Sequence, residues 1–241
     1  AETLPRVISS SQDSFSEILL SLPLFQGLGR RDMDELLSKT KFHFQKFVVG
    51  NVICEETAPC KDLLFVTKGE LKVSHGSENN KVIFHEILKA PIDLGIENMF
   101  GISQYHMRTI TAQTDVQMFT IAKEFVTGIL LKYDVFRFNV LGLLCNRLQR
   151  ADRILWTSPS EQLMRKFIQV CMRNFQRPYG SKIIQGKMAD LAIYVGATRL
   201  KLSRLLNHLE ENQLVILERK RIYIPRFEEL VRYSQDHPDW E

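Results

Sequence analysis

The chain has 241 residues, of which 44% are hydrophobic and 25% charged, and this predicts a folded protein of one large or two ordinary domains. Residues 1–150 hold 17 basic and 17 acidic side chains, whereas residues 160–226 hold 13 basic and 5 acidic ones, so positive charge gathers where a polyanion would bind. The spacing of the cysteines argues against a zinc site and against disulfides. Hydropathy argues against a membrane span, and the N-terminal segment lacks a signal-peptide pattern. We therefore expect a cytoplasmic protein with no metal site and no membrane partner.

Helical and then β-strand patterns fill the first half of the chain. Residues 16–40 predict one or two short helices, broken at Pro23 and between Gly27 and Gly29. The spacing and punctuation of the next segments indicate an antiparallel β-roll, or jelly roll, within a first domain at residues 1–134. Its strands are expected at 42–49, 52–54, 63–67, 71–74, 82–88, 109–112 and 116–121.

A long central helix is predicted at residues 135–157. It carries an apolar stripe at alternating three- and four-residue spacing that would accept a partner helix. The alternative is that the stripe packs only on the β-roll of its own chain. We favour dimerisation, because two-fold DNA-binding proteins commonly present paired helices. The stripe consists of Phe138, Leu141, Leu144, Cys145, Leu148 and Leu155.

A C-terminal domain is expected at residues 158–241. Ser158, Pro159 and Glu161 have the spacing of a capping box with proline in the first turn, which predicts a new helix that runs to about Phe175. The residues from Trp156 to Ser158 would then form a short joint at which the C-terminal domain changes its angle.

Residues 187–209 predict two helices separated by a glycine, the pattern of a helix-turn-helix. Gly196 supplies the turn, and Thr198 is a suitable N-cap for the second helix. Apolar positions on both helices share one buried face: Leu191, Ala192, Val195, Leu202, Leu205, Leu206 and Leu209. Residues 214–217 and 221–224 then predict a β-hairpin around the polar turn 218–220, which makes the domain a winged helix.

These elements, with three local motifs, resemble the cyclic-AMP receptor protein/FNR family of bacterial transcription regulators. The motifs are LPLF at 22–25, LLFVTKGELKV at 63–73 and DLAIYVGATRLKLSRLLNHLEENQLV at 190–215. The resemblance covers nearly the whole chain. It implies an α+β homodimer that binds a small effector in the β-roll and docks on a pseudopalindromic operator in double-stranded DNA, with RNA polymerase as a further partner.

The resemblance places the DNA-binding residues on the second helix of the motif and on the wing. Both main subgroups of the family have glutamate where this chain has Leu200, and leucine offers only an apolar contact, for instance to a thymine methyl group. We assign Arg204 to a guanine, because arginine to guanine is the commonest specific contact. Lys187 is assigned to phosphate. The full set is Lys187, Thr198, Arg199, Leu200, Lys201, Ser203, Arg204, Arg219 and Lys220.

The effector residues carried over from the family are Glu97, His106, Arg108 and Thr109. They match only approximately the Gly-Glu turn and Arg-Ser pair that grip a cyclic nucleotide, so the sequence argues against cyclic AMP. Haem stays open because His43, His75, His85 and His106 occur in the β-roll, whereas Cys54 and Cys60 are too few for an iron-sulfur cluster. A regulator that needs no ligand fits equally well.

Two other classes of function, a sensor that acts on a protein partner and an enzyme, have less support in the sequence. A sensor module for a cyclic nucleotide or haem could act on a protein partner instead of DNA, but the positive charge in residues 160–226 favours nucleic acid. An enzyme is not expected, because the sequence shows no paired catalytic carboxylates, nucleophile triad or phosphate-binding loop.

Overall fold

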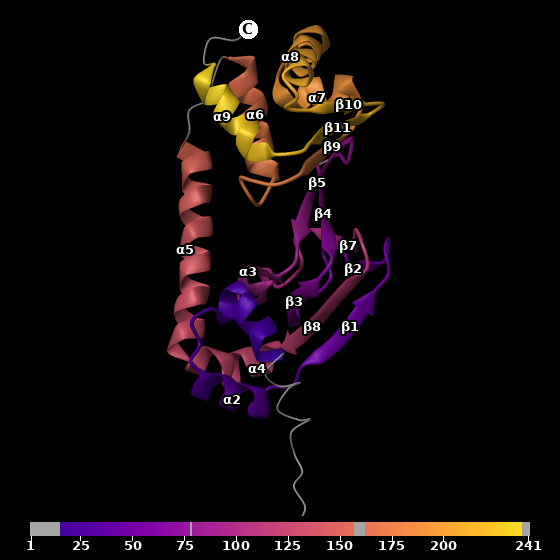
Figure 1. Ribbon diagram of the computed structural model, residues 1–241. Coiled ribbons are helices and arrows are strands. Elements are labelled where there is room, and N and C mark those ends of the chain that lie inside the picture. The colour runs from indigo at the N-terminus through magenta and orange to yellow at the C-terminus, as the bar shows by residue number, and fades with distance from the viewer. Residues whose placement is uncertain (1–14, 78, 157–161, 238–241) are drawn as a thin grey trace, which may run out of the picture. The chain divides into compact units, whose positions relative to one another are not determined.

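The structure is a computed structural model that describes residues 15–77, 79–156 and 162–237 (Figure 1). The chain folds into two compact units, which we call the first and second units. Among the described residues, the first unit comprises those within Ala1–Glu70, Lys89–Met107 and Ala112–Leu148, and the second comprises those within Leu71–Leu88, Arg108–Thr111 and Gln149–Glu241.

The first unit is built on an antiparallel sheet with strand order β1-β8-β3-β6. Apolar side chains on one face of β3 and β8 pair across the ladder, Leu63 opposite Ile121 and Phe65 opposite Phe119, and the last two rings stack at 4.9 Å. Helices cover this face and complete a core with the buried Phe25 and Phe136. The strands of this sheet are β1 (His43–Phe47), β3 (Asp62–Lys68), β6 (Ile92–Leu94) and β8 (Val116–Ala122), and the unit also contains the short strand β2 (Val52–Cys54) outside this sheet.

Short helices complete the first unit. They are η1 (Pro23–Phe25), α2 (Arg30–Lys39), α3 (Ile96–Met99), α4 (Lys123–Gly128) and η2 (Leu130–Lys132). The long helix α5 (Asp134–Trp156) follows, close to its predicted bounds of 135–157. Phe136 and Val140 on α5 are buried in the core of the first unit. Most of the stripe predicted on this helix is exposed instead, with Phe138 67%, Leu148 63% and Leu155 76% accessible.

In the residues that the structure describes, the second unit combines a sheet with helices. Its strands lie in the order β10-β11-β9-β5-β4-β7, and neighbouring strands β5, β9, β11 and β10 pair antiparallel. The strands are β4 (Glu70–Gly76), β5 (Val82–Lys89), β7 (Thr109–Ala112), β9 (Lys182–Gly186), β10 (Ile216–Glu218) and β11 (Arg221–Ile224). The helices are α6 (Leu163–Asn174), α7 (Met188–Val195), α8 (Arg199–Glu211) and α9 (Phe227–Asp236).

The hairpin formed by β4 and β5 belongs to the second unit, although it lies within the first domain predicted at residues 1–134. The physical reason is side-chain packing, because Val82 and Phe84 on β5 are buried in the same core as Phe167 and Leu206. Strand β9, which the sequence analysis did not predict, supplies the edge on which β5 pairs. The compact units do not coincide with the predicted domain limits at 134, 157 and 158, which stay predictions.

Helix α6 begins at Leu163, with Gln162 in the N-cap position and no side-chain cap bond. The capping box of Ser158, Pro159 and Glu161 and most of the joint from Trp156 to Ser158 lie outside the described residues. The other end of α6 is well defined. Arg108 donates to the Asn174 carbonyl at 2.8 Å and Arg150 donates to the Phe175 carbonyl at 2.9 Å, which places positive charge at the negative end of the helix dipole.

Candidate nucleic-acid interface

The turn between α7 and α8 has the geometry of a helix-turn-helix. Gly196 has φ +74°, a left-handed conformation that a residue without a Cβ adopts at no steric cost, and its N–H closes α7 on carbonyls of that helix. Thr198 is the N-cap residue of α8, and its hydroxyl accepts a hydrogen bond from the Lys201 N–H at 3.3 Å. The sequence predicted both roles, and the structure confirms them.

Buried leucines fix the rotation of α8. The side chains of Leu202, Leu205, Leu206 and Leu209 are all 0% exposed and pack into the core of the second unit. Because a helix has 3.6 residues per turn, the predicted DNA-binding side chains face the solvent. Arg199, Leu200, Lys201 and Arg204 are exposed, and Ser203 is half-buried. The first two turns of α8 therefore present three cations and one apolar side chain.

Helix α7 adds two features to this surface. Lys187 occupies its N-cap position and is exposed, as expected of a residue that meets phosphate. Ile193 is 79% exposed, although its neighbours Ala192 and Val195 are buried. Ile193 was not among the predicted DNA-binding residues. The signal was its place off the buried stripe, where an apolar side chain has no packing role.

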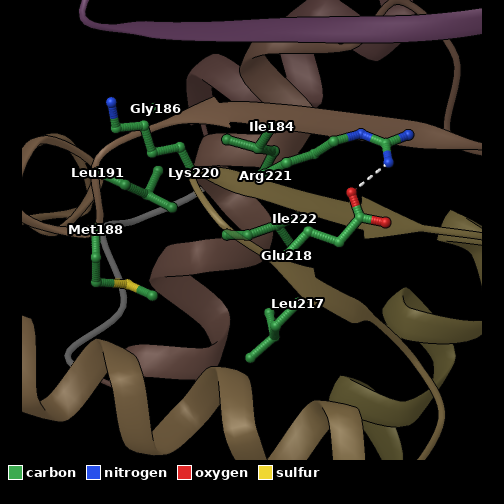
Figure 2. Close-up of a pocket in the computed structure, with 9 residues that line it drawn as sticks. All are labelled: Ile184, Gly186, Met188, Leu191, Leu217, Glu218, Lys220, Arg221 and Ile222. Atoms are coloured by element: carbon green, nitrogen blue, oxygen red, sulfur yellow. Dashed lines mark hydrogen bonds and ion pairs between the residues drawn. The ribbon is translucent and has the colours of Figure 1, made fainter.

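The wing is the turn between β10 and β11, where Arg219 and Lys220 are exposed. Lys220 has φ +59°, which shapes the tight turn. Arg221 is engaged differently, since its Nη1 lies 2.5 Å from the Glu218 carboxylate and its guanidinium lies over the Tyr223 ring. Behind the wing is a cavity of about 70 Å³, well below the usual range of about 300–1,000 Å³ for small-molecule sites. Figure 2 shows it between the Lys220–Arg221 turn and Leu217.

The four predicted effector residues fall into two groups. Glu97, on α3 of the first unit, forms an ion pair with Arg147 of α5, with 2.5 Å between Oε2 and Nη1. His106 is buried in the same unit, and this burial lowers its pKa against the opposing effect of the Glu97 and Asp62 carboxylates. Arg108 and Thr109 belong to the second unit, where Arg108 binds the end of α6 and Thr109 begins β7.

His106 lines a cavity of about 440 Å³ in the first unit, within the usual range of about 300–1,000 Å³ for small-molecule sites. Its polar lining also includes Gln45, Glu55, Lys61, Asp62 and Thr120. His85 has no such access, because its two ring nitrogens contact Ser74 and Gln185. Within residues 15–77, 79–156 and 162–237, no group of three His, Cys, Asp or Glu side chains is arranged to hold a metal ion.

Two family models match the chain, one in each half. Residues 44–133 match the cyclic nucleotide-binding domain, and residues 161–233 match the Crp-like helix-turn-helix domain. This pairing in one chain, in this order, decides the family. The chain belongs to the Crp/Fnr family of transcriptional regulators.

The chain is also similar to individual proteins and solved structures. The global nitrogen regulator of Synechococcus elongatus is 24% identical over 210 residues, which are 84% of this chain and 91% of that protein. A solved structure described as a Crp/Fnr-family transcriptional regulator from Eubacterium rectale has a TM-score of 0.50 at 19% identity and covers 88% of this chain and 98% of its own. The sensor domain of the transcriptional regulator DNR from Pseudomonas aeruginosa also has a TM-score of 0.50, at 19% identity, over 62% of this chain and 99% of its own.

As a Crp/Fnr regulator, the protein is a DNA-binding transcription factor with an effector domain, and its family is not one of enzymes. The predicted α+β architecture, with its β-roll and winged helix-turn-helix, is confirmed. In the part of the chain that the structure describes, no helix combines the length and the hydropathy that a membrane crossing requires.

Proposed function

We propose that the protein is a homodimeric, sequence-specific regulator of transcription that binds a pseudopalindromic operator and responds to a small molecule in its first unit. The proposal rests mainly on the exposed side chains of Arg199, Lys201 and Arg204, which lie on a helix whose opposite face is fully buried. Such a helix fits the major groove, where arginine pairs with guanine and Leu200 contacts a thymine methyl group. By family analogy, RNA polymerase is the partner of the DNA-bound form in the cytoplasm.

The DNA target tests this proposal directly. Selection of bound duplexes from a random library should enrich two inverted half-sites whose centres lie about 34 Å, or one helical turn, apart. Each half-site should contain a guanine and should lack the base pattern that a glutamate at position 200 would select. Enrichment of no sequence, with equal retention of all duplexes, would contradict specific binding and leave only electrostatic attraction.

Dimerisation is proposed through the exposed stripe of α5. Leu148 is 63% exposed although it is apolar and lies beside exposed Leu141 and Cys145, a grouping that another copy of the same helix would bury. The substitution Leu148→Glu places two unpaired carboxylates in such an interface, and we expect the dimer to weaken at least about 100-fold. Native mass spectrometry across a concentration series measures this, and the same spectra report any small molecule retained in the first unit.

Leu200→Glu is the matched control for that experiment. The substitution is chemically identical to Leu148→Glu, and Leu200, at 62% exposed, is nearly as exposed as Leu148. Leu200 lies on α8, outside the proposed interface. The control should retain the dimer mass of the wild type. A Leu148→Glu protein that stays dimeric at every concentration would show that α5 does not form the interface.

The effector is proposed to occupy the 440 Å³ cavity beside His106. The lining mixes the carboxylates of Glu55 and Asp62 with Lys61 and neutral hydrogen-bonding groups, which suits a small polar molecule. Glu97 is committed to Arg147, so its carboxylate would have to leave that ion pair before it could hold a ribose. This favours an effector other than cyclic AMP.

A further inference from the structure

The hairpin of β4 and β5 extends the wing sheet. Strand β5 pairs antiparallel with β9 in a continuous register that begins with Val82 opposite Gly186 and Ile83 opposite Gln185. On its other side β9 pairs with β11 of the wing, with Gln185 opposite Arg221. Figure 1 shows β5, β9 and β11 side by side. The register brings the turn-proximal end of β5 next to the turn of the wing.

Gly186 permits this approach. A Cβ at this position would lie 2.8 Å from the Lys81 carbonyl oxygen and 3.3 Å from the Val82 Cα, distances at which the backbone of β5 would have to move. The Gly186 N–H also donates to the Lys220 carbonyl at 2.9 Å. Gly186 therefore lies close to the backbone of Lys81 on one side and is hydrogen-bonded to the backbone of Lys220 on the other.

Three lysines surround the cavity that results, which we call the lysine hollow. Lys81 from the hairpin, Lys187 from the start of α7 and Lys220 from the wing line this space of about 380 Å³, and all three are exposed. Among the described residues that line it, Asp190 carries the one negative charge. Like charges gathered in this way repel one another unless an anionic partner neutralises them. Two of the three, Lys187 and Lys220, are residues already assigned to the DNA interface.

We propose that Lys81 is a DNA-phosphate contact, so that the β4–β5 hairpin forms part of the DNA-binding surface. The inference rests on the proposed function and adds a surface from a segment that lies about 100 residues before the helix-turn-helix in sequence. This hairpin lies inside the match to the cyclic nucleotide-binding domain, at 44–133. Phosphate contacts carry no base information, so Lys81 would raise affinity for all duplexes equally.

The test is a titration of fluorescent duplexes at several KCl concentrations, with a selected operator and a scrambled duplex. Lys81→Ala should weaken both complexes by the same factor, about three- to tenfold at low salt, and should reduce the slope of log K against log salt by about two, one for each subunit of the dimer. Lys220→Ala should behave in the same way. Lys81→Arg keeps the charge and should retain both the affinity and the slope.

Lys72→Ala is the matched control, because Lys72 lies in β4 of the same hairpin but does not line the lysine hollow. It should leave both the affinity and the salt slope unchanged. Equal losses in Lys72→Ala and Lys81→Ala would show that any lysine of the hairpin has the same effect through long-range charge, and this would overturn the proposal. Lys81→Ala binding that matches the wild type, while Lys220→Ala binding is weakened, would also overturn it. Failure of the wild type to bind either duplex would instead reject the proposed function.

Gly186→Ala provides a second, geometric test. Displacement of β5 should weaken DNA binding in the wild-type background but have little further effect in a Lys81→Ala background, since the lysine that β5 presents is already gone. Circular dichroism melting identifies a variant that fails to fold. Additive losses in the double variant of a folded protein would contradict presentation of Lys81 by the β5–β9 pairing.

Discussion

Arg204→Ala should abolish most of the preference for the operator over other DNA. A bidentate arginine–guanine pair discriminates by about 1–3 kcal/mol, and a dimer contains two, so we expect a loss of about 2–6 kcal/mol. That corresponds to a weakening between about 30-fold and 10⁴-fold for the operator. Arg204 is exposed on the second turn of α8, directly after the half-buried Ser203, and Leu205 behind it is fully buried. Fluorescence anisotropy with the selected operator measures the loss.

Arg204→Lys separates base contact from charge. Lysine preserves the positive charge but lacks the planar fork that matches the two acceptors of guanine. We expect it to bind scrambled duplex as the wild type does, while preference for the guanine-containing operator falls. If Arg204→Ala lowered operator and scrambled binding by the same factor, Arg204 would be a phosphate contact and the assignment to guanine would be wrong.

Local periodicity explains why the helix-turn-helix could be predicted so closely. The four leucines of α8, Gly196 and Thr198 act within one or two turns of their own positions, so the sequence alone contains the relevant geometry. Strands β2 and β7 were predicted with their observed bounds for the same reason. The exposed face of α8 then follows from its buried face.

Pairing between distant segments could not be predicted in this way. Strand β9 is only five residues long, with two adjacent isoleucines as its signal, and its partner β5 lies about 100 residues earlier. The ion pair of Glu97 with Arg147 likewise joins α3 to α5 across 50 residues. Family resemblance placed Glu97 at the effector site from its local motif, but a local motif does not reveal a partner on a distant helix.

Lys182 illustrates the same limit in the core of the second unit. A lysine at the start of a strand is ordinarily a surface residue, yet its side chain is 0% exposed. Its Nζ lies 2.5 Å from the carboxylate of Glu86, whose side chain is 1% exposed. The same Nζ lies over the Phe175 ring, 5.4 Å from the ring centroid. Burial lowers the pKa of Lys182, and the attraction of Glu86 opposes that shift. Glu86 also accepts the N–H groups of Gln176 and Arg177, at 3.1 and 2.9 Å.

Lys182→Met should lower the free energy of unfolding of the second unit by about 3–5 kcal/mol, because it leaves the Glu86 carboxylate buried without its ion-pair partner. Methionine has a similar length and fills the space, so the loss arises from charge and not from a cavity. Urea denaturation followed by circular dichroism measures it. Lys39→Met is the matched control, since Lys39 pairs with Glu35 at an exposed site, and it should leave the unfolding free energy nearly unchanged.

The double variant Lys182→Met/Glu86→Gln distinguishes an unpaired charge from lost packing. A neutral amide removes the buried charge and can still accept an N–H from the turn after α6, so the double variant should be more stable than Lys182→Met alone. A double variant less stable than either single variant would show that the polar contacts of Glu86, and not its charge, hold the turn. Because Glu86 belongs to β5 and Lys182 to β9, this pair also fixes the hairpin on the wing sheet. Loss of the pair should therefore weaken DNA binding in the same salt-dependent way as loss of Lys81.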